Sequence, residues 1–283
     1  FATSKGNVRR NRLSDFANIR ANGLIAMKLE EEGEKLVGVR TCSEDMDVLL
    51  ATHDGKCIRF PISDVRVFSG RTSTGVRGIK LGDGDEVVTL SMLTHVESSP
   101  EERAAYLKAK RERGLEMEGE AAPDAEGATL PEVTLAPGRY EELEALEQYI
   151  LTVSDRGFGK RSSSYEYRVS GRGGQGIWNM EMGGKNGSIV AAFPVNAADQ
   201  VMMVTDRGQV IRMPVHDVRI AGRKTQGVTL FRIDAEEHLV SVASIADDQS
   251  EQGQTDLGQT EDHQGQPDLT QAEPEAGANE AGV

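Results

Sequence analysis

The chain has 283 residues, of which 37% are hydrophobic and 28% are charged, and its formal net charge is −14. No apolar run in these 283 residues is long enough to span a membrane as a helix, and the sequence shows no pattern of a signal peptide. The hydrophobic content is low for a chain that is folded throughout, which indicates that part of it lies outside any core.

The acidic side chains are concentrated in two segments. Residues 97–146 hold 13 acidic and 6 basic side chains, and residues 247–283 hold 10 acidic side chains and no lysine or arginine. The rest of the chain holds 26 basic and 23 acidic side chains, a net charge of +3. The acidic average therefore describes these two segments, and the remainder can carry a basic surface.

A motif that recurs four times sets the organisation of the chain. In each copy a short segment ends in a turn closed by glycine, with arginine four residues and an acid nine residues after that glycine. The turn glycines, 49, 102 and 51 residues apart, are Gly6, Gly55, Gly157 and Gly208. The middle gap is one repeat plus an insertion of similar length. A fixed period of about fifty residues indicates an array of stacked units.

Within each copy the residue pattern predicts four short strands. In the second copy, the apolar segment 48–51 leads into Asp54-Gly55, a pair favoured at the centre of a two-residue type I′ hairpin. Residues 56–60 then alternate polar and apolar side chains, as a strand with one buried face does. A glycine-led segment at 75–81 and a further apolar pair complete the unit.

Four strands in about fifty residues are typical of one blade of a propeller. A single blade cannot bury both of its faces, so neighbouring blades must stack. Helical repeats fit less well, because an apolar period of two dominates and glycine is frequent. We therefore predict an all-β, propeller-like array with two blades in residues 1–96 and two further blades in residues 147–246. Residues 1–3 read as the end of a strand already under way, so we expect a piece of a longer protein.

Residues 97–146 form the insertion between the second and third copies. Segment 100–113 has good helix formers and a proline in its first turn, which predicts a helix. We expect an acidic, partly helical insertion and interpret it as a mobile surface excursion, with a partner site as the alternative. Residues 247–283 contain almost nothing apolar and are expected to be a disordered acidic tail.

Basic residues recur in the loop before each glycine-led segment. The eleventh position after the turn glycine is arginine in copies two to four and Ala17 in the first copy, where Arg20 is close by. A second basic position follows four or five residues later. Together the two positions hold Arg66, Arg71, Arg168, Arg172, Arg219 and Arg223, the last followed by Lys224.

Stacked blades carry equivalent loops to equivalent places, so these side chains are expected to form a repeated basic track. Such a track suits the phosphates of DNA, because phosphate contact needs charge and position but no reading of bases. Arginine suits this role because its planar fork can bind a phosphate through two N–H groups. The alternative is that the arginines pair with acids of their own repeat, for example Asp64 with Arg66.

The most distinctive local sequence is the glycine-rich segment 170–176, which contains Arg172, Gly173, Gly174 and Gln175. Its four glycines allow close approach of the backbone to a ligand, and their amides can bind an anion. It is not a phosphate-binding loop of the Gly-Lys-Ser/Thr kind. It is interpreted either as a contact to the DNA backbone or as a flexible loop between strands.

The sequence does not favour catalysis. The five histidines occur singly, without metal-ligand spacing, and there is no Gly-x-Ser-x-Gly motif, so we predict no catalytic residue and no metal site. Cys42 and Cys57 are interpreted as reduced thiols of a cytoplasmic protein, with a disulfide between them as the alternative. Trp178 is interpreted as a strand-packing residue, with base stacking as the alternative.

Several of these segments resemble the C-terminal blades of the A subunit of bacterial DNA gyrase, and the resemblance covers about residues 1–95 and 147–246. The segments that carry it are 52–59, 74–81 with 83–88, 201–208 and 222–228. The resemblance implies a six-bladed β-pinwheel, of which this chain is the last four blades, whose outer rim binds and bends double-stranded DNA. One departure is that the family's first-blade element, Gln-Arg-Arg-Gly-Gly-Lys-Gly, is missing, while residues 171–176 keep only its Arg-Gly-Gly-x-Gly part.

The resemblance also implies a setting in a type II topoisomerase. DNA wrapping would support ATP-dependent negative supercoiling, an isomerase reaction, by a cytoplasmic holoenzyme that also contains the DNA gyrase B subunit and a second A subunit. ATP and Mg²⁺ would be used elsewhere in the holoenzyme, and no cofactor is expected in this chain, which would itself be non-catalytic. The acidic tail is either solubilising or a competitor of DNA phosphates for the basic blades.

On this interpretation, the expected DNA contacts are Arg10, Arg20, Arg59, Arg66, Arg71, Arg161, Arg168, Arg172, Gly173, Gly174, Gln175, Arg212, Arg219, Arg223 and Lys224. Three other functions stay open: the equivalent domain of topoisomerase IV, a protein-binding propeller scaffold, and an enzyme that uses a central channel. A scaffold would expose an apolar patch in place of a basic rim.

Overall fold

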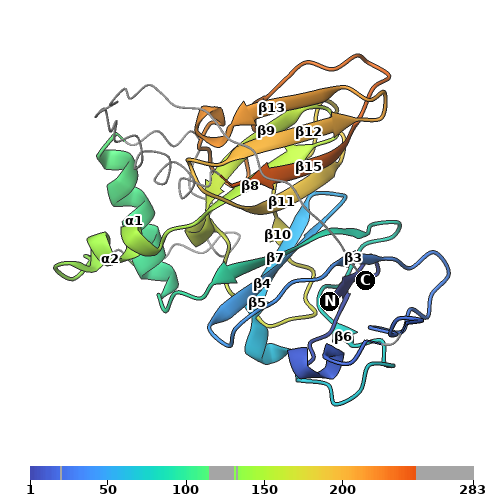
Figure 1. The fold of residues 1–283 in the computed structure, drawn as a ribbon. Helices are drawn as coiled ribbons and strands as arrows, with labels where there is room; N and C mark the ends of the chain where they lie inside the picture. The colour runs from blue at the N-terminus through green and yellow to red at the C-terminus, as the bar shows by residue number, and fades with distance from the viewer. Residues whose placement is uncertain (20, 115–130, 132, 247–283) are drawn as a thin grey trace, which may run out of the picture. The chain divides into compact units, whose positions relative to one another are not determined.

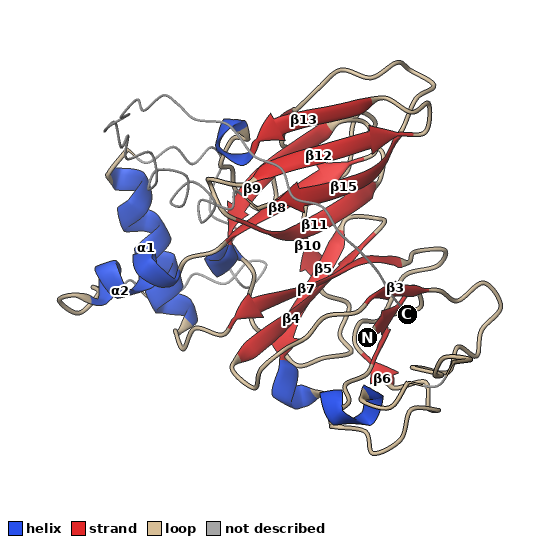
Figure 2. Ribbon diagram, viewed as in Figure 1, coloured by secondary structure: helices blue, strands red, loops and turns tan. Residues whose placement is uncertain are grey.

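The computed structural model describes residues 1–19, 21–114, 131 and 133–246. One compact unit spans Phe1–Asp247, and its described part is mainly β, with four antiparallel sheets and two α-helices (Figure 1, Figure 2). None of the described helices is long and apolar enough to cross a membrane. The predicted tail lies outside the described residues, as does part of the insertion (residues 115–130 and 132).

The first two sheets have four strands each. In spatial order, the strands of the first sheet are β3 (Leu36–Gly38), β1 (Ala2–Thr3), β2 (Asn7–Val8) and β6 (Val76–Arg77). Those of the second sheet are β10 (Ile177–Trp178), β5 (Lys56–Pro61), β4 (Met46–Thr52) and β7 (Val87–Thr94).

The third sheet has four strands and the fourth has three. In spatial order, the strands of the third sheet are β11 (Ile189–Val195), β8 (Tyr149–Ser154), β9 (Phe158–Ser163) and β14 (Val228–Thr229). Those of the fourth sheet are β13 (Val210–Pro214), β12 (Gln200–Thr205) and β15 (Leu239–Ile245). The predicted propeller-like, all-β architecture with one sheet for each copy is confirmed.

The glycine-led strands of the second, third and fourth copies do not complete their own sheets, and residues 23–29 of the first copy form no strand, so the prediction that four strands of one copy form one unit is wrong. In the second, third and fourth copies this strand pairs with the hairpin of the preceding copy: β6 with β2, β10 with β5, and β14 with β9. Each of the first three sheets therefore borrows one strand from the next copy, and the fourth sheet has three strands.

The physical reason is visible at the glycine that opens each borrowed strand. Gly227, before β14, has a φ of +74°, and a Cβ there would lie 2.7 Å from the Gly159 carbonyl of the third sheet. Gly176 has a similar φ of +73°, and a Cβ there would lie even closer to the carbonyl oxygen of Cys57. Only glycine combines this conformation with so close an approach between two backbones.

The hairpin turn of the second copy also differs from the prediction. The Gly55 N–H donates to the Thr52 carbonyl at 3.1 Å, so glycine occupies the fourth position of the turn, at a φ of +91°. The Lys56 N–H then donates to the Thr52 hydroxyl. The connection is a three-residue loop with a bulge, in which glycine takes the left-handed position, and the two-residue type I′ turn is wrong.

Successive residues of the central strands face opposite neighbours, which explains why the copies must stack. On β4, Val48 and Leu50 belong to the core between the first and second sheets, whereas Leu49 packs in the core between the second and third sheets. On β8, Ile150 joins that same core and Leu151 joins the core against the fourth sheet. Burial of both faces is what a lone blade cannot achieve.

The predicted helix of the insertion is α1 (Pro100–Glu112), and a second helix, α2 (Arg139–Leu146), follows. Ser99 and Glu102 form a capping box at the start of α1. Both helices lie beside the third sheet and contribute to a buried cluster that includes Tyr106, Leu143 and Tyr165 (Figure 1). The described part of the insertion is thus docked on the blades, and its interpretation as a mobile excursion does not hold there.

Candidate nucleic-acid interface

Three equivalent loops cross from one blade to the preceding blade. They are residues 65–75, 167–176 and 218–227, called the crossing loops below. Each forms a parallel bridge with the arginine four residues after the preceding copy's turn glycine, and the bridges are Arg10–Val67, Arg59–Val169 and Arg161–Ile220. The first two crossing loops are tied at these bridges by hydrogen bonds from Phe68 N to Arg10 O and from Ser170 N to Arg59 O, both 2.9 Å.

The bridging arginines hold the junctions through their side chains as well. Arg161 Nε donates to the Val218 carbonyl at 2.6 Å, and the equivalent Arg10 donates to the Val65 carbonyl. Arg10 also pairs with the exposed carboxylate of Glu44 at 2.9 Å. Arg161 is 8% exposed and Arg59 is 4% exposed. The sequence pattern had grouped these three arginines with the expected DNA contacts. In the structure they lie at the junctions with the next blade and form hydrogen bonds there.

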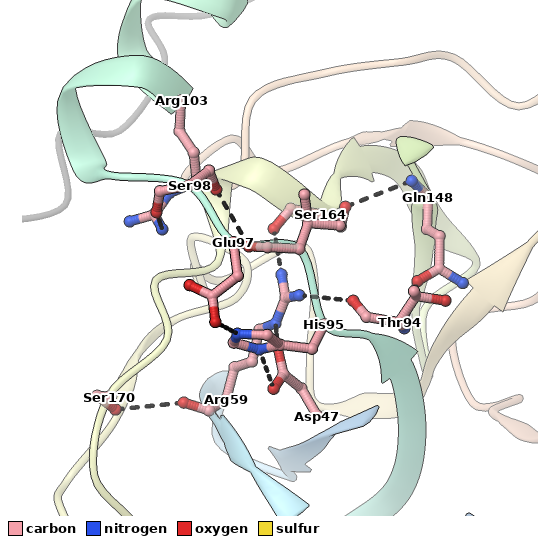
Figure 3. Close-up of polar contacts among 11 residues, drawn as sticks. Asp47, Arg59, Thr94, His95, Glu97, Ser98, Arg103, Gln148, Ser164 and Ser170 are labelled. Carbon is pink, nitrogen blue, oxygen red and sulfur yellow. Dashed lines mark hydrogen bonds and ion pairs between the residues drawn. The ribbon is translucent and has the colours of Figure 1, made fainter. Parts of the chain in front are cut away.

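Arg59 forms the most elaborate of these junctions (Figure 3). Its guanidinium donates to Asp47 Oδ2 at 2.8 Å, to the Ser164 carbonyl at 2.9 Å and to the Thr94 carbonyl at 3.1 Å. The other Asp47 oxygen lies 2.8 Å from His95 Nδ1. Burial lowers the pKa of Arg59, and the Asp47 carboxylate opposes that shift. A fully buried ion pair with carbonyl acceptors on both sides fastens the second blade to the third.

Arg223 is also buried, at 2% exposure. Its backbone N–H donates to a Glu166 carboxylate oxygen at 2.6 Å, its Nε donates to the Glu166 carbonyl at 2.8 Å, and its Nη1 donates to the Trp178 carbonyl. The side chain therefore points into the junction between the third and fourth blades. No signal in the sequence indicates this, because Arg223 and its neighbour Lys224 are both basic and only their burial differs.

The other basic side chains of the crossing loops reach the surface. Arg66 is exposed and lies 4.4 Å from the centre of the Phe68 ring. Arg172 is exposed and donates to the carbonyls of Asp64 and Arg77 at 2.9 and 3.0 Å. Arg219 is exposed, and the remaining three are partly exposed: Arg71, Arg168 and Lys224. Arg20 lies outside the described residues.

The glycine-rich segment is an ordered part of the second crossing loop. The Gly173 N–H donates to the Gly78 carbonyl at 2.6 Å, and the Gly174 carbonyl accepts from Lys80 N at 2.8 Å. The Gly173 amide is thus occupied within the protein, whereas Gly174 and Gln175 are exposed. The interpretation of a flexible loop is replaced by a loop held against the preceding repeat.

Exposed cations that the sequence reasoning missed lie beside this loop. Arg77 on β6 and Lys80 just after it are exposed, and Arg172 bonds to the Arg77 carbonyl. Lys56 lies with its Nζ 3.7 Å from the centre of the Trp178 ring, which is 38% exposed. The sequence did contain a signal for these exposed side chains. Successive side chains of a strand point to opposite faces, and the outward position of the glycine-led strand holds Arg77 in the second copy and Trp178 in the third.

Within the described ranges, no group of three or more His, Cys, Asp or Glu side chains could hold a metal ion. Both cysteines are free, Cys42 exposed and Cys57 buried, so no disulfide joins them. What the described surface offers is a series of cations on equivalent loops of consecutive blades. Such a series can contact phosphates spaced along a strand.

Comparison with known proteins places this arrangement in a family. The family model described as "DNA gyrase C-terminal domain, beta-propeller" matches residues 1–43, 47–93, 148–196 and 199–246. The DNA gyrase A subunit of Granulibacter bethesdensis is 53% identical over 262 residues, which cover 88% of this chain and 28% of that protein. The DNA gyrase A subunit of Rickettsia bellii is 45% identical over 248 residues, which cover 87% of this chain and 27% of that protein.

Two solved structures share the fold. A crystal structure of the C-terminal domain of DNA topoisomerase IV has a TM-score of 0.63 at 18% identity and covers 87% of this chain and 60% of its own. A structure of the DNA gyrase A C-terminal domain has a TM-score of 0.61 at 22% identity and covers 87% of this chain and 64% of its own. With four family matches in succession on four blades linked by borrowed strands, the chain belongs to the family of C-terminal β-propeller domains of the DNA gyrase A subunit.

Proposed function

We propose that this chain binds double-stranded DNA without reading its sequence and bends it along the crossing loops, as part of a DNA gyrase A subunit. The observation that carries the proposal is the equivalence of three exposed or partly exposed arginines, Arg66, Arg168 and Arg219, at one position of three consecutive blades. Equivalent charges on a repeating scaffold match the repeating phosphates of a duplex.

The proposed contact set is narrower than the sequence alone indicated. It consists of Arg66, Arg71, Arg168, Arg172, Gly174, Gln175, Arg219 and Lys224, with Arg77 and Lys80 added. The buried arginines Arg59, Arg161 and Arg223 act indirectly, through hydrogen bonds that join neighbouring blades. Bending costs several kcal/mol for a tight curve, and many phosphate contacts must offset it.

We propose that the chain works within a DNA gyrase holoenzyme, as part of an A subunit like those of its relatives. The chain corresponds to a little over a quarter of their length, so catalysis, ATP and Mg²⁺ use, and assembly with the gyrase B subunit and a second A subunit belong to the rest of a holoenzyme in the cytoplasm. The DNA-bending domain itself would be non-catalytic and would support negative supercoiling. The likeness to the topoisomerase IV domain concerns the fold alone, whereas the relatives of higher identity are gyrases, so the gyrase setting is the one we propose.

The experiment is duplex binding across a salt series, with the wild-type chain and the triple variant Arg66→Ala/Arg172→Ala/Arg219→Ala. Two unrelated duplex sequences should bind alike, and affinity should fall steeply with salt. The triple variant should flatten the slope of log affinity against log salt by about 1 for each phosphate that it no longer neutralises.

The matched control removes the same charge away from the crossing loops, through Arg40→Ala/Arg207→Ala/Arg232→Ala, all at exposed positions. It should keep most of the wild-type slope. Equal decreases in affinity for both triple variants would reject the crossing loops as the contact surface, and no binding by the folded wild-type chain at low salt would reject the proposed function.

A further inference from the structure

A buried lysine lies directly beneath the third crossing loop. Lys160 on β9 is 0% exposed, and its ammonium donates to the Gly222 carbonyl at 2.9 Å, to the Thr225 carbonyl at 2.8 Å and to the Arg223 carbonyl. Three carbonyls of one short turn thus converge on one side chain of the preceding blade. The turn is closed by a 3.0 Å hydrogen bond from Thr225 N to Gly222 O.

The ammonium is not required for stacking the blades. The third position after the turn glycine holds Lys160 in the third copy but Ile58 in the second, and the junction that Ile58 forms has the same borrowed strand and parallel bridge. Burying an ammonium costs several kcal/mol unless its three N–H groups are satisfied. An apolar residue would therefore suffice for packing. The ammonium of Lys160 instead forms hydrogen bonds with the carbonyls of the crossing loop.

In two of the described blades, a cationic side chain at this position donates hydrogen bonds to a crossing loop. In the first copy it is Arg9, which is 2% exposed, donates to the Ser73 carbonyl at 2.6 Å and lies 5.0 Å from the Phe68 ring centre. Ser73 and Phe68 belong to the first crossing loop. At the second junction, where Ile58 cannot donate, the loop is tied by Arg172 to the Asp64 and Arg77 carbonyls instead.

We propose that Lys160 is a positioning residue for DNA binding, which holds the turn at residues 222–225 so that Arg219 and Lys224 present their charges at a fixed place on the rim. This inference rests on the proposed function for its DNA part. The loop part stands on the protein alone, so the two can be tested separately.

The loop part is tested by hydrogen exchange of the DNA-free chain. Three amides of the turn region bond within the junction, from Ala221 to Arg161 O, from Arg223 to Glu166 Oε2 and from Thr225 to Gly222 O. The variant Lys160→Met should exchange these amides about tenfold faster or more, because the turn opens locally.

The control variant is Lys110→Met, which removes another buried ammonium, one that bonds to Glu147 and to Tyr149 at 2.6 Å in the insertion. It should speed exchange around α1 and leave residues 221–225 unchanged. Unchanged exchange of residues 221–225 in Lys160→Met would overturn the inference, whatever the chain does with DNA.

The DNA part is tested by a double-mutant cycle on folded proteins. Lys160→Met should weaken duplex binding about three- to tenfold in the wild-type background and add almost nothing in the background Arg219→Ala/Lys224→Ala, because the charges that it positions are gone. Lys160→Arg should restore binding, as Arg9 fills the same role. Additive effects, or binding by Lys160→Arg as weak as by Lys160→Met, would show that Lys160 does not act through these two side chains. If the wild-type chain fails to bind DNA, the proposed function fails, and the exchange result still decides what Lys160 does to the loop.

Discussion

The third and fourth copies have the same hairpin pattern in different surroundings. A Cβ on Gly157 would lie 2.6 Å from the Phe231 carbonyl of the next copy, whereas Gly208 has nothing within 4 Å. Arg161 is buried beneath a crossing loop, whereas Arg212 is exposed and donates to Gln200 at 2.6 Å. The same position of the repeat is therefore buried in a junction where the next copy covers it. It is exposed where no described residue of a next copy covers it.

The first copy shows the complementary half of this difference. Gly23, at the equivalent position of the first copy, has a positive φ of +78° like the glycines that open the borrowed strands, but no strand follows it and nothing lies within 4 Å of it. Ile25, two residues later, is 64% exposed, whereas the borrowed strands of later copies lie against a hairpin. The two ends of the described array therefore expose the two halves of a junction, and equivalent positions differ in whether a neighbouring copy covers them.

The largest effect is expected at the junction arginines. Arg59→Ala should lower the free energy of unfolding by about 3–5 kcal/mol, because it leaves the Asp47 carboxylate buried with one partner fewer. Arg212→Ala, at the open position, should change it by less than about 0.5 kcal/mol. Urea unfolding measures both, and similar decreases for the two variants would show that coverage by the next copy does not set the role of this arginine.

The turn glycines give a second matched pair. Both have positive φ, +76° at Gly157 and +83° at Gly208, so alanine at either position costs about 1 kcal/mol of backbone strain. Gly157→Ala adds a clash with the Phe231 carbonyl and should be less stable by about 2 kcal/mol more. Equal unfolding midpoints for the two variants would contradict the tight approach of the third hairpin to the fourth copy.

Lys160 makes the covered junction sensitive to pH. Burial lowers the pKa of Lys160 to about 7, an effect that the Glu166 carboxylate opposes and the Arg223 guanidinium reinforces. Cys57 and Glu181 also face it. Between pH 7 and about 10 the unfolded chain binds more protons than the folded chain at this site, so its contribution to stability rises with pH.

The stability of the wild-type chain relative to Lys160→Met should therefore increase between pH 7 and pH 9, by about 1 kcal/mol per pH unit. Urea midpoints at several pH values measure this difference. In Lys160→Arg, where the guanidinium stays charged, the difference from Lys160→Met should not change with pH. A flat wild-type difference would mean that the ammonium keeps its proton throughout.

The smallest perturbation is thiol labelling. It measures, without any mutation, whether a neighbouring strand covers a cysteine. Cys57 is paired with Ile177 of the borrowed strand β10, and burial raises the pKa of its thiol to about 12, whereas Cys42 is exposed in the first copy. Iodoacetamide should modify Cys42 in the folded chain and Cys57 only after unfolding. Comparable labelling rates for the two cysteines in the folded state would show that β10 leaves its junction readily.

The sequence predicted the parts of the fold that depend on local pattern. The four copies, their hairpins and the helix α1 followed from glycine spacing, alternation and helix formers. The borrowed strands did not follow, because a two-residue strand such as β10 has no register signal of its own, and the closeness of Gly176 to Cys57 joins two segments far apart in the sequence.

The candidate site was predictable in kind and only partly in detail. Basic residues at repeated positions marked the loops that reach the surface, including Arg66 and Arg219. The burial of Arg59 and Arg223 could not be deduced from the sequence. A long cationic side chain can lie in a junction and donate to carbonyls there, or it can extend into water. Which of the two occurs depends on the neighbouring copy, as Arg212 demonstrates.

The most direct test of the central claim is hydrogen exchange of the wild-type chain with and without a saturating duplex. If the crossing loops form one DNA-binding track, all three of them, residues 65–75, 167–176 and 218–227, should gain protection together, while the hairpin turns around Gly55, Gly157 and Gly208 stay unchanged. Protection of the hairpin turns, or of one crossing loop alone, would contradict a DNA path across consecutive blades.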